Sequence, residues 1–173
     1  MQVRHLRASD ATASFACGDA GLDRFLQRHA WQNQDALGIG VTYVATPGSE
    51  IAGYVTLAAG ALERDVVPTD PVAAYPRYPL PFLRLARLAV DARVQGVGVG
   101  SALVDFALRV AWTMRGQVGY AGVAVDALPG AVDYYETLGF GQLAVLRGSS
   151  TARPRQIPMY LSLNKARPLL EID

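Results

Sequence analysis

The sequence predicts an α/β fold in which a mixed, mostly antiparallel central sheet is flanked by helices. Two observations predict this class. An apolar, strand-like run at residues 83–90 leads through a polar corner and three closely spaced glycines into a segment with helical apolar spacing. A second apolar run, residues 120–125, follows that helix. Strands joined by a helical crossover lie parallel, whereas most other strand-like segments here are separated by turns and are expected to pair antiparallel.

The N-terminal segment is predicted to form a short strand and then a helix. Residues 2–6 alternate between polar and apolar side chains, as a strand does. Asp10 and Asp19 are both candidate N-caps for a helix that runs to about Gln34. The apolar face of this helix would be formed by Leu22, Phe25, Leu26, His29 and Ala30.

A β-hairpin is predicted next. Residues 40–46 and 51–58 are strand-like, and the four residues between them are Pro47, Gly48, Ser49 and Glu50. A short connection of this composition joins antiparallel strands.

Residues 60–81 are predicted to be irregular because they contain five prolines, namely Pro68, Pro71, Pro76, Pro79 and Pro81. Long loops in compact domains are often functional, and this one carries Tyr75, Arg77 and Tyr78 directly before the central strand. Two roles are open: a proline-stiffened connection, or one wall of a substrate site.

The central helix has a single predicted apolar face, made of Val99, Ala102, Leu103, Phe106, Ala107, Val110, Ala111 and Met114. A second helix is predicted after residues 120–125. Pro129 suits its first turn, Gly139 suits its C-terminal cap, and its apolar positions are Val132, Tyr135 and Leu138. Residues 140–146 and 157–163 are predicted to close the sheet as a strand pair.

Length and composition predict one domain over residues 1–173. There is no run of about 18 apolar residues and the N-terminus lacks a signal-peptide pattern, so we expect a cytoplasmic protein without a membrane partner. The single cysteine, Cys17, excludes an internal disulfide and is expected to be packed. With two histidines, both near the N-terminus, we expect no metal site.

The glycine turn, residues 96–100, is the strongest local signal for a ligand. Backbone N–H groups at a helix N-terminus favour an anion, and Gly96, Gly98 and Gly100 allow close approach of a phosphate. From Gln95 the spacing is Q-x-x-G-x-G, which matches neither the Rossmann fingerprint nor the P-loop. By itself, this turn is also consistent with a tight strand-to-helix connection.

Flanking residues make the pattern more specific. Residues 87–91 followed by 95–100, together with residues 133–140, resemble the acetyl-CoA-binding and later tyrosine motifs of the GNAT family of N-acetyltransferases. Further segments resemble the toxin subgroup of toxin–antitoxin pairs: residues 15–18, 22–26, 53–57 and 76–81. The matching segments run from about residue 15 to residue 160, nearly the whole chain.

The resemblance implies acetyl-CoA as cosubstrate, no metal, and a parallel strand pair splayed around the acetyl-CoA site. Leu88, Ala89 and Val90 would offer backbone groups to the pantetheine arm and the thioester carbonyl, and amides of the glycine turn would hold the pyrophosphate. Val97 stands where many members carry Arg or Lys, so Arg93 is the nearest substitute. The full set of implied cofactor-binding residues is Leu88, Ala89, Val90, Arg93, Gln95, Gly96, Val97, Gly98, Val99, Gly100 and Ser101.

Tyr135 matches the tyrosine that protonates the leaving thiolate in the GNAT family. Tyr134 is expected to be a packing residue. A phenol with a pKa near 10 and a thiol near 8.5 allow such a transfer. The alternative for Tyr135 is a core tyrosine with a satisfied hydroxyl. A general base for the acceptor amine is not identifiable, since Asp126 at the end of the predicted strand is the only acidic residue there.

Toxin relatives acetylate the amino acid on a charged tRNA and are neutralised by a ribbon-helix-helix antitoxin. We therefore expect aminoacyl-tRNA as acceptor, such an antitoxin as partner, and a homodimer. Arg77, Tyr78, Arg84 and Arg87 are the candidate substrate-binding residues. A net charge of only +1 also fits arginines in surface ion pairs. The other open functions are acetylation of a small amine or a protein amino group, and a catalytically silent CoA-binding module.

Overall fold

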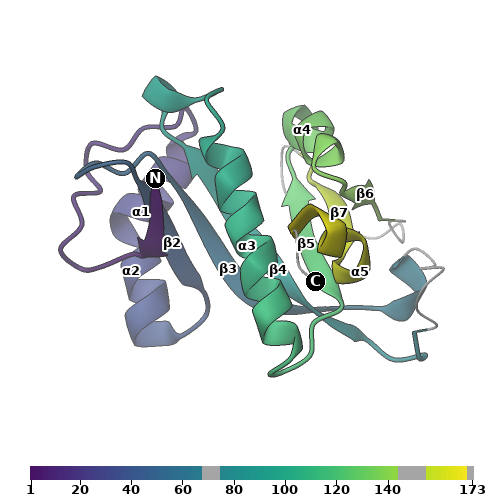
Figure 1. Cartoon of the computed structure of the whole chain (residues 1–173). Helices are drawn as coiled ribbons and strands as arrows, with labels where there is room; N and C mark the ends of the chain where they lie inside the picture. Colours follow the sequence, from purple (N-terminus) through teal and green to yellow (C-terminus); the bar gives the residue numbers. More distant parts are fainter. Residues whose placement is uncertain (68–74, 144–154, 171–173) are drawn as a thin grey trace. The chain divides into compact units, whose positions relative to one another are not determined.

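The computed structural model describes residues 1–67, 75–143 and 155–170. Within these residues it contains a seven-stranded mixed sheet in the order β1-β2-β3-β4-β5-β7-β6, in which β4 and β5 are the parallel pair (Figure 1). The predicted fold class is therefore confirmed. The strands are β1 (Gln2–His5), β2 (Val41–Thr46), β3 (Gly53–Leu62), β4 (Leu80–Val90), β5 (Gly122–Ala127), β6 (Gly141–Gln142) and β7 (Ile157–Ser162).

The helices among the described residues are α1 (Ala20–Arg28), α2 (Ala30–Gln32), α3 (Val99–Arg115), α4 (Val132–Thr137) and α5 (Leu163–Ala166), joined by short 3₁₀ and π turns. None of the described helices has the length and apolarity needed to span a bilayer. The chain forms two compact units, which we describe separately. Unit 1 comprises Met1–Ala58 and Leu85–Ala107, and unit 2 comprises Ala59–Arg84 and Leu108–Asp173. The single domain over residues 1–173 stays a prediction.

The helical segment of unit 1 begins where one of the two candidate caps predicted it. The Asp19 carboxylate accepts from the amides of Gly21 and Leu22, at 2.8 and 3.0 Å. Asp10 instead pairs with Arg4 at 2.8 Å. The prediction of one helix to Gln34 was wrong, because His29 adopts a φ of −120°, which ends α1 and starts α2.

The predicted hairpin is confirmed as β2 and β3, which pair antiparallel with Val41 opposite Leu57 and Ala45 opposite Gly53. The predicted end of the second strand was wrong. β3 continues through Gly60 to Leu62, so the irregular segment is shorter than residues 60–81 and ends where β4 begins, at Leu80. Residues 68–74, with Pro68 and Pro71, lie outside the described part of the chain.

Gly53 brings α3 close to the strands in unit 1. A Cβ added there would lie 2.9 Å from the carbonyl oxygen of Ala89 and 3.0 Å from Cγ1 of Val99. The first distance is shorter than real Cβ contacts and the second is unusually tight, so glycine lets the first turn of α3 lie directly on β3 and β4. The start of α3 is thus positioned by the absence of a side chain.

The bounds predicted for α3 are confirmed, but its buried face is broader than predicted. Its fully buried residues are Val99, Leu103, Val104, Ala107, Leu108 and Ala111. Phe106, Val110 and Met114 are only half-buried. A helix that packs on a sheet buries a stripe wider than one line of i, i+3 and i+4 positions, which explains why Val104 and Leu108 join the core.

Unit 2 is built on β5 and β7, which pair antiparallel from Gly122 opposite Ser162 to Ala127 opposite Ile157. The predicted closing strand pair is confirmed in type but not in extent: β6 covers only Gly141–Gln142, and residues 144–154 lie outside the described chain. Leu163, predicted in the last strand, starts α5, because the Ser162 hydroxyl caps that helix by accepting from the Lys165 amide at 3.2 Å.

We expect Gly122→Ala to destabilise the protein. A Cβ at Gly122 would overlap the ring of Tyr160 and lie 2.5 Å from the carbonyl oxygen of Leu161, and the backbone atom has little room to move. Overpacking of this kind costs about 1–3 kcal/mol. The free energy of unfolding, measured in urea, should fall by that amount.

Gly141→Ala is the matched control, because an added Cβ there meets no atom within 4 Å and Gly141 is also a strand residue. Equal stability of the two variants would contradict the packing argument.

Candidate active site

The corner at the end of β4 is held by the buried carboxylate of Asp91. It accepts hydrogen bonds from the amide and Nε of Arg93, at 3.0 and 2.8 Å, and from the amide of Ala16 at 3.3 Å. The Asp91 amide donates to the carbonyl of Ala52 at 2.9 Å. One residue therefore joins the end of β4 to the N-terminal segment and to the start of β3.

Arg93 is held by two carboxylates. Its Nε and one terminal nitrogen bind Asp91, and the other terminal nitrogen lies 3.0 Å from Glu50. The guanidinium hydrogen-bonds the Asp91 carboxylate and lowers the pKa of Asp91 to about 2. For Arg93, the structure therefore shows ion pairs with carboxylates, which the low net charge had suggested as the alternative to phosphate binding. A contact between Arg93 and a CoA phosphate stays a prediction, and the guanidinium would have to share its donors.

Gln95 is used to hold the same corner. Its Nε2 donates to the carbonyls of Val90 and Cys17, at 3.0 and 2.8 Å. The side-chain nitrogen of Gln95 is thus hydrogen-bonded within unit 1, and a contact between Gln95 and the cofactor stays a prediction. Burial raises the pKa of the Cys17 thiol to about 11, so this thiol is protonated at neutral pH.

The glycine turn follows directly. Gly96 and Gly98 have φ values of 79° and 93°, which L side chains rarely adopt, and the Val97 side chain between them is 74% exposed. The prediction that Gly100 belongs to this turn was wrong. Gly100 lies inside α3, which begins at Val99.

Three backbone N–H groups at the start of α3 have no acceptor within the helix. The first helical hydrogen bond runs from the Ala102 amide to the Gly98 carbonyl at 3.0 Å, which leaves the amides of Val99, Gly100 and Ser101. These donors lie at the positive end of the helix dipole, where an anion is stabilised. The turn as folded fits a phosphate group.

In β4, the residues before the corner differ in exposure. Ala89 is buried, with its carbonyl against Gly53, whereas Leu88 and Val90 are half-buried. Arg87 is exposed, and its guanidinium lies 3.8 Å from the centre of the Phe25 ring in α1. This cation–π contact positions the guanidinium of an exposed residue.

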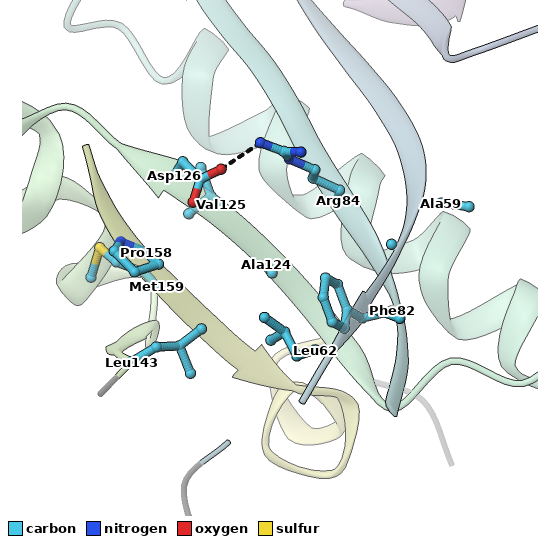
Figure 2. Close-up of a pocket in the computed structure, with 12 residues that line it drawn as sticks. Ala59, Leu62, Phe82, Arg84, Ala124, Val125, Asp126, Leu143, Pro158 and Met159 are labelled. Atoms are coloured by element: carbon cyan, nitrogen blue, oxygen red, sulfur yellow. Dashed lines mark hydrogen bonds and ion pairs between the residues drawn. The ribbon is translucent and has the colours of Figure 1, made fainter. Parts of the chain in front are cut away.

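Arg84 and Asp126 form an ion pair in unit 2, with 2.5 Å between Arg84 Nη2 and Asp126 Oδ2. Asp126 lies near the end of β5, which covers Gly122–Ala127 and not the predicted residues 120–125. The pair borders a pocket of about 300 Å³ (Figure 2). The described residues that line it are Ala59, Gly60, Ala61, Leu62, Phe82, Arg84, Ala124, Val125, Asp126, Leu143, Pro158 and Met159.

Of the four candidate substrate-binding residues, only Arg84 lines this pocket. Arg77 and Tyr78 are exposed but are not among its described lining residues, and Arg87 belongs to unit 1. The apolar walls were missed from the sequence. β3 had been expected to end before Leu62, and nothing in the local pattern of Phe82 or Met159 separates a pocket residue from a core residue.

Tyr135 is buried in unit 2, with 5% of its surface exposed. Its ring meets those of Tyr134 and Phe140 edge-on, with centroid distances of 5.2 and 5.5 Å. Gly139, at a φ of 91°, turns the chain so that the Phe140 amide donates to the Tyr135 carbonyl at 3.1 Å. Burial raises the pKa of the Tyr135 phenol above its ordinary value, so it is protonated at neutral pH.

Across residues 1–67, 75–143 and 155–170, no group of three or more His, Cys, Asp or Glu side chains is arranged to hold a metal ion.

Comparison with known proteins gives a consistent result. The model of the acetyltransferase (GNAT) family matches residues 3–140. The tRNA-acetylating toxin of Mycobacterium tuberculosis is 30% identical over 125 residues, which are 72% of this chain and 74% of that protein.

Two solved structures are similar over nearly the whole chain. AtaT complexed with acetyl-methionyl-tRNAfMet is 27% identical, with a TM-score of 0.82 and coverage of 97% of this chain and 98% of that one. A tyrosine-to-phenylalanine mutant of the AtaT toxin, bound to the C-terminus of the antitoxin AtaR and acetyl-CoA, is also 27% identical. Its TM-score is 0.75, and the match covers 97% of this chain and 96% of that one.

We expect Asp91→Asn to destabilise the protein in a pH-dependent way. The pKa of Asp91 is lowered to about 2 in the folded state. Its contribution to stability is therefore complete above about pH 4 and is lost as the pH falls through the folded pKa. At neutral pH the free energy of unfolding should fall by about 2 kcal/mol, as for hydrogen bonds to a charged group.

Thermal and urea unfolding from neutral pH to acid pH checks this expectation, with the exposed Asp35→Asn as control. The gap between wild type and Asp91→Asn should shrink on acidification. A gap that stays constant with pH would show that the charge of Asp91 does not stabilise the corner.

Proposed function

The chain belongs to the acetyltransferase (GNAT) family, and on this basis we propose that it is a toxin that acetylates the amino group of aminoacyl-tRNA. The observation that carries the proposal is its 30% identity, over most of both chains, to a tRNA-acetylating toxin. The similarity to AtaT complexed with acetyl-methionyl-tRNAfMet supports the same acceptor. An acetylated amine is no longer a nucleophile for peptide-bond formation, so translation would stop.

In this proposal the start of α3 binds the pyrophosphate of acetyl-CoA. Gly96 and Gly98 supply the positive φ angles that the turn needs, and the amides of Val99, Gly100 and Ser101 are the donors. Val97 contributes no charge, so the binding depends on backbone groups. Leu88, Ala89 and Val90 offer the end of β4 to the pantetheine arm and polarise the thioester carbonyl.

The reaction is an acyl transfer from sulfur to nitrogen. The neutral acceptor amine attacks the thioester carbon, an N–C bond forms, and the C–S bond breaks. The nitrogen loses a proton to water, and the sulfur leaves as a thiolate that takes a proton from the Tyr135 hydroxyl, which is then reprotonated from solvent. Because burial raises the pKa of Tyr135, this phenol is protonated over the whole physiological range, but it is a weaker acid than a free phenol.

The tRNA backbone is proposed to contact exposed arginines and an exposed aromatic residue. Arg87 is an exposed residue whose guanidinium lies over the Phe25 ring. Arg77 and Tyr78 are exposed next to β4. Arg84 is available to phosphate only by sharing its contact with Asp126. Because the net charge is +1, binding has to come from such local groups and not from the whole molecule.

The similarity to AtaT bound to the C-terminus of AtaR supports an antitoxin partner for this chain. We further propose a ribbon-helix-helix antitoxin, a homodimer and a cytoplasmic location. The antitoxin should relieve growth arrest when it is expressed with this chain.

Gly98→Ala should weaken acetyl-CoA binding much more than Gly100→Ala does. Gly98 has a φ of 93°, a conformation that strains any residue with a Cβ by roughly 1–2 kcal/mol, whereas Gly100 lies within α3. Calorimetric titration with acetyl-CoA should show an affinity loss of about tenfold or more for Gly98→Ala. Equal affinities of the two variants would contradict the proposed turn.

Tyr135→Phe should abolish growth arrest on expression. Loss of a positioned proton donor lowers turnover by about 10²–10⁴-fold, while acetyl-CoA affinity should be unchanged. The measurement is mass spectrometry of tRNA-linked amino acids after incubation with protein and acetyl-CoA. Tyr134→Phe is the matched control and should retain activity, since Tyr134 is expected only to pack.

The proposal fails if no charged tRNA is acetylated by the wild-type protein. Acetylation of polyamines or peptides in the same assay would then favour an acetyltransferase for small amines or protein amino groups. Acetyl-CoA binding without turnover on any acceptor would favour a silent CoA-binding module.

A further inference from the structure

The pocket of unit 2 is apolar on its walls and charged at one end (Figure 2). Leu62, Phe82, Leu143 and Met159 supply the large apolar surfaces. Among its described lining residues, Arg84 and Asp126 are the ionisable ones, and they face each other from the parallel strands β4 and β5. Such a cavity suits a ligand with an apolar body and one charged or polar end.

Packing behind the walls fixes the shape of this pocket. A Cβ at Gly60 would lie 3.0 Å from the Phe82 ring, so glycine in β3 lets that ring lie close to the strand. The Phe82 ring contacts the Tyr160 ring edge-on, with 6.3 Å between the ring centroids. The Tyr160 ring lies so close to Gly122 that a Cβ there would overlap it. Gly60 and Phe82 thus line the cavity, and Tyr160 contacts the Phe82 ring.

The ion pair at the end of the pocket is weakly held. The side chains of Arg84 and Asp126 are 52% and 36% exposed, and pairs this open to water contribute little to stability. A cationic or hydrogen-bonding ligand group can therefore replace the guanidinium beside Asp126 at low cost. The Asp126 carboxylate, which lies where the apolar walls end, can therefore bind a ligand group in place of Arg84.

We propose that this pocket receives the apolar side chain of the acceptor aminoacyl group, and that Asp126 contacts the amino group that is acetylated. The inference rests on the proposed function and names the class of aminoacyl-tRNA it acts on. At about 300 Å³ the cavity is large enough for one amino-acid side chain.

The same walls exclude other acceptors. With the amino group placed at Asp126, a charged side chain would point along the apolar walls, away from the ion pair. It would lose its hydration against Leu62, Phe82 and Met159, and glycine would leave the cavity filled with water. Hydrophobic pockets discriminate by about tenfold or more per methylene group. We therefore expect aminoacyl groups such as methionyl, leucyl and phenylalanyl to be preferred over glycyl, aspartyl and lysyl groups.

The test uses amino-acid amides, which carry the acceptor amine and side chain but no phosphate. Calorimetric titration of the full-length protein with methioninamide, leucinamide, glycinamide, aspartic acid α-amide and lysinamide should show tighter binding of the first two by about tenfold or more. Ala61→Leu, an exposed strand position that lines the pocket, should abolish this preference. Ala36→Leu, exposed and outside the pocket, is the matched control and should preserve it.

A second pair of variants tests Asp126. Asp126→Asn and Arg84→Gln both break the same ion pair, but only the first removes the carboxylate. Asp126→Asn should weaken methioninamide binding by about tenfold, whereas Arg84→Gln frees the Asp126 carboxylate from its ion pair and should tighten binding. Equal losses in the two variants would overturn the assignment of Asp126.

The outcomes separate this inference from the proposed function. If charged tRNAs are acetylated without regard to side chain, the pocket inference is overturned and the tRNA function stands. If apolar amides bind selectively but no tRNA is acetylated, the pocket assignment stands and the tRNA acceptor is wrong. Absence of any preference among the amides overturns the inference whatever the result with tRNA.

Discussion

The candidate cofactor site depends on the hydrogen bonds of one buried carboxylate, that of Asp91. It binds Arg93 and the Ala16 amide, and its own amide binds the Ala52 carbonyl. Three segments that are far apart in sequence therefore meet at the end of β4. A charged acceptor in a buried position is favourable only when its hydrogen bonds are satisfied, so the corner has one stable geometry. The positions of Gly96 and Gly98 follow from that geometry.

Glycines decide the close contacts of this fold in two different ways. Gly96, Gly98 and Gly139 are needed for a positive φ, and an added Cβ would meet open space at Gly96 and Gly98. Gly53 and Gly122 have ordinary backbone angles, and there an added Cβ would meet other atoms. The first kind sets the path of the chain, and the second lets α3 and Tyr160 lie directly on the sheet.

Much of the fold could be predicted because the signals are local. The spacing of apolar residues predicted α3 and the β2–β3 hairpin, and Gly139 predicted the end of α4. The errors arose where tertiary contacts override local preference. β3 runs through Gly60, where the lack of a side chain leaves room for the Phe82 ring, and α5 follows β7 because Ser162 caps it. Leu163 was assigned to the strand because an apolar residue fits either element equally well.

The glycine turn before α3 could be recognised from residue types at fixed short spacing, and Tyr135 became the candidate proton donor through the resemblance of residues 133–140 to the GNAT family. Which polar groups are already engaged became known only from the folded chain. Arg93 binds its near neighbour Asp91 and also Glu50, which lies 43 residues away along the chain. Gln95 likewise donates to the carbonyl of Val90 and to that of Cys17, which lies 78 residues away. The apolar pocket also came only from the structure, since four strands contribute its walls and no single segment carries its pattern.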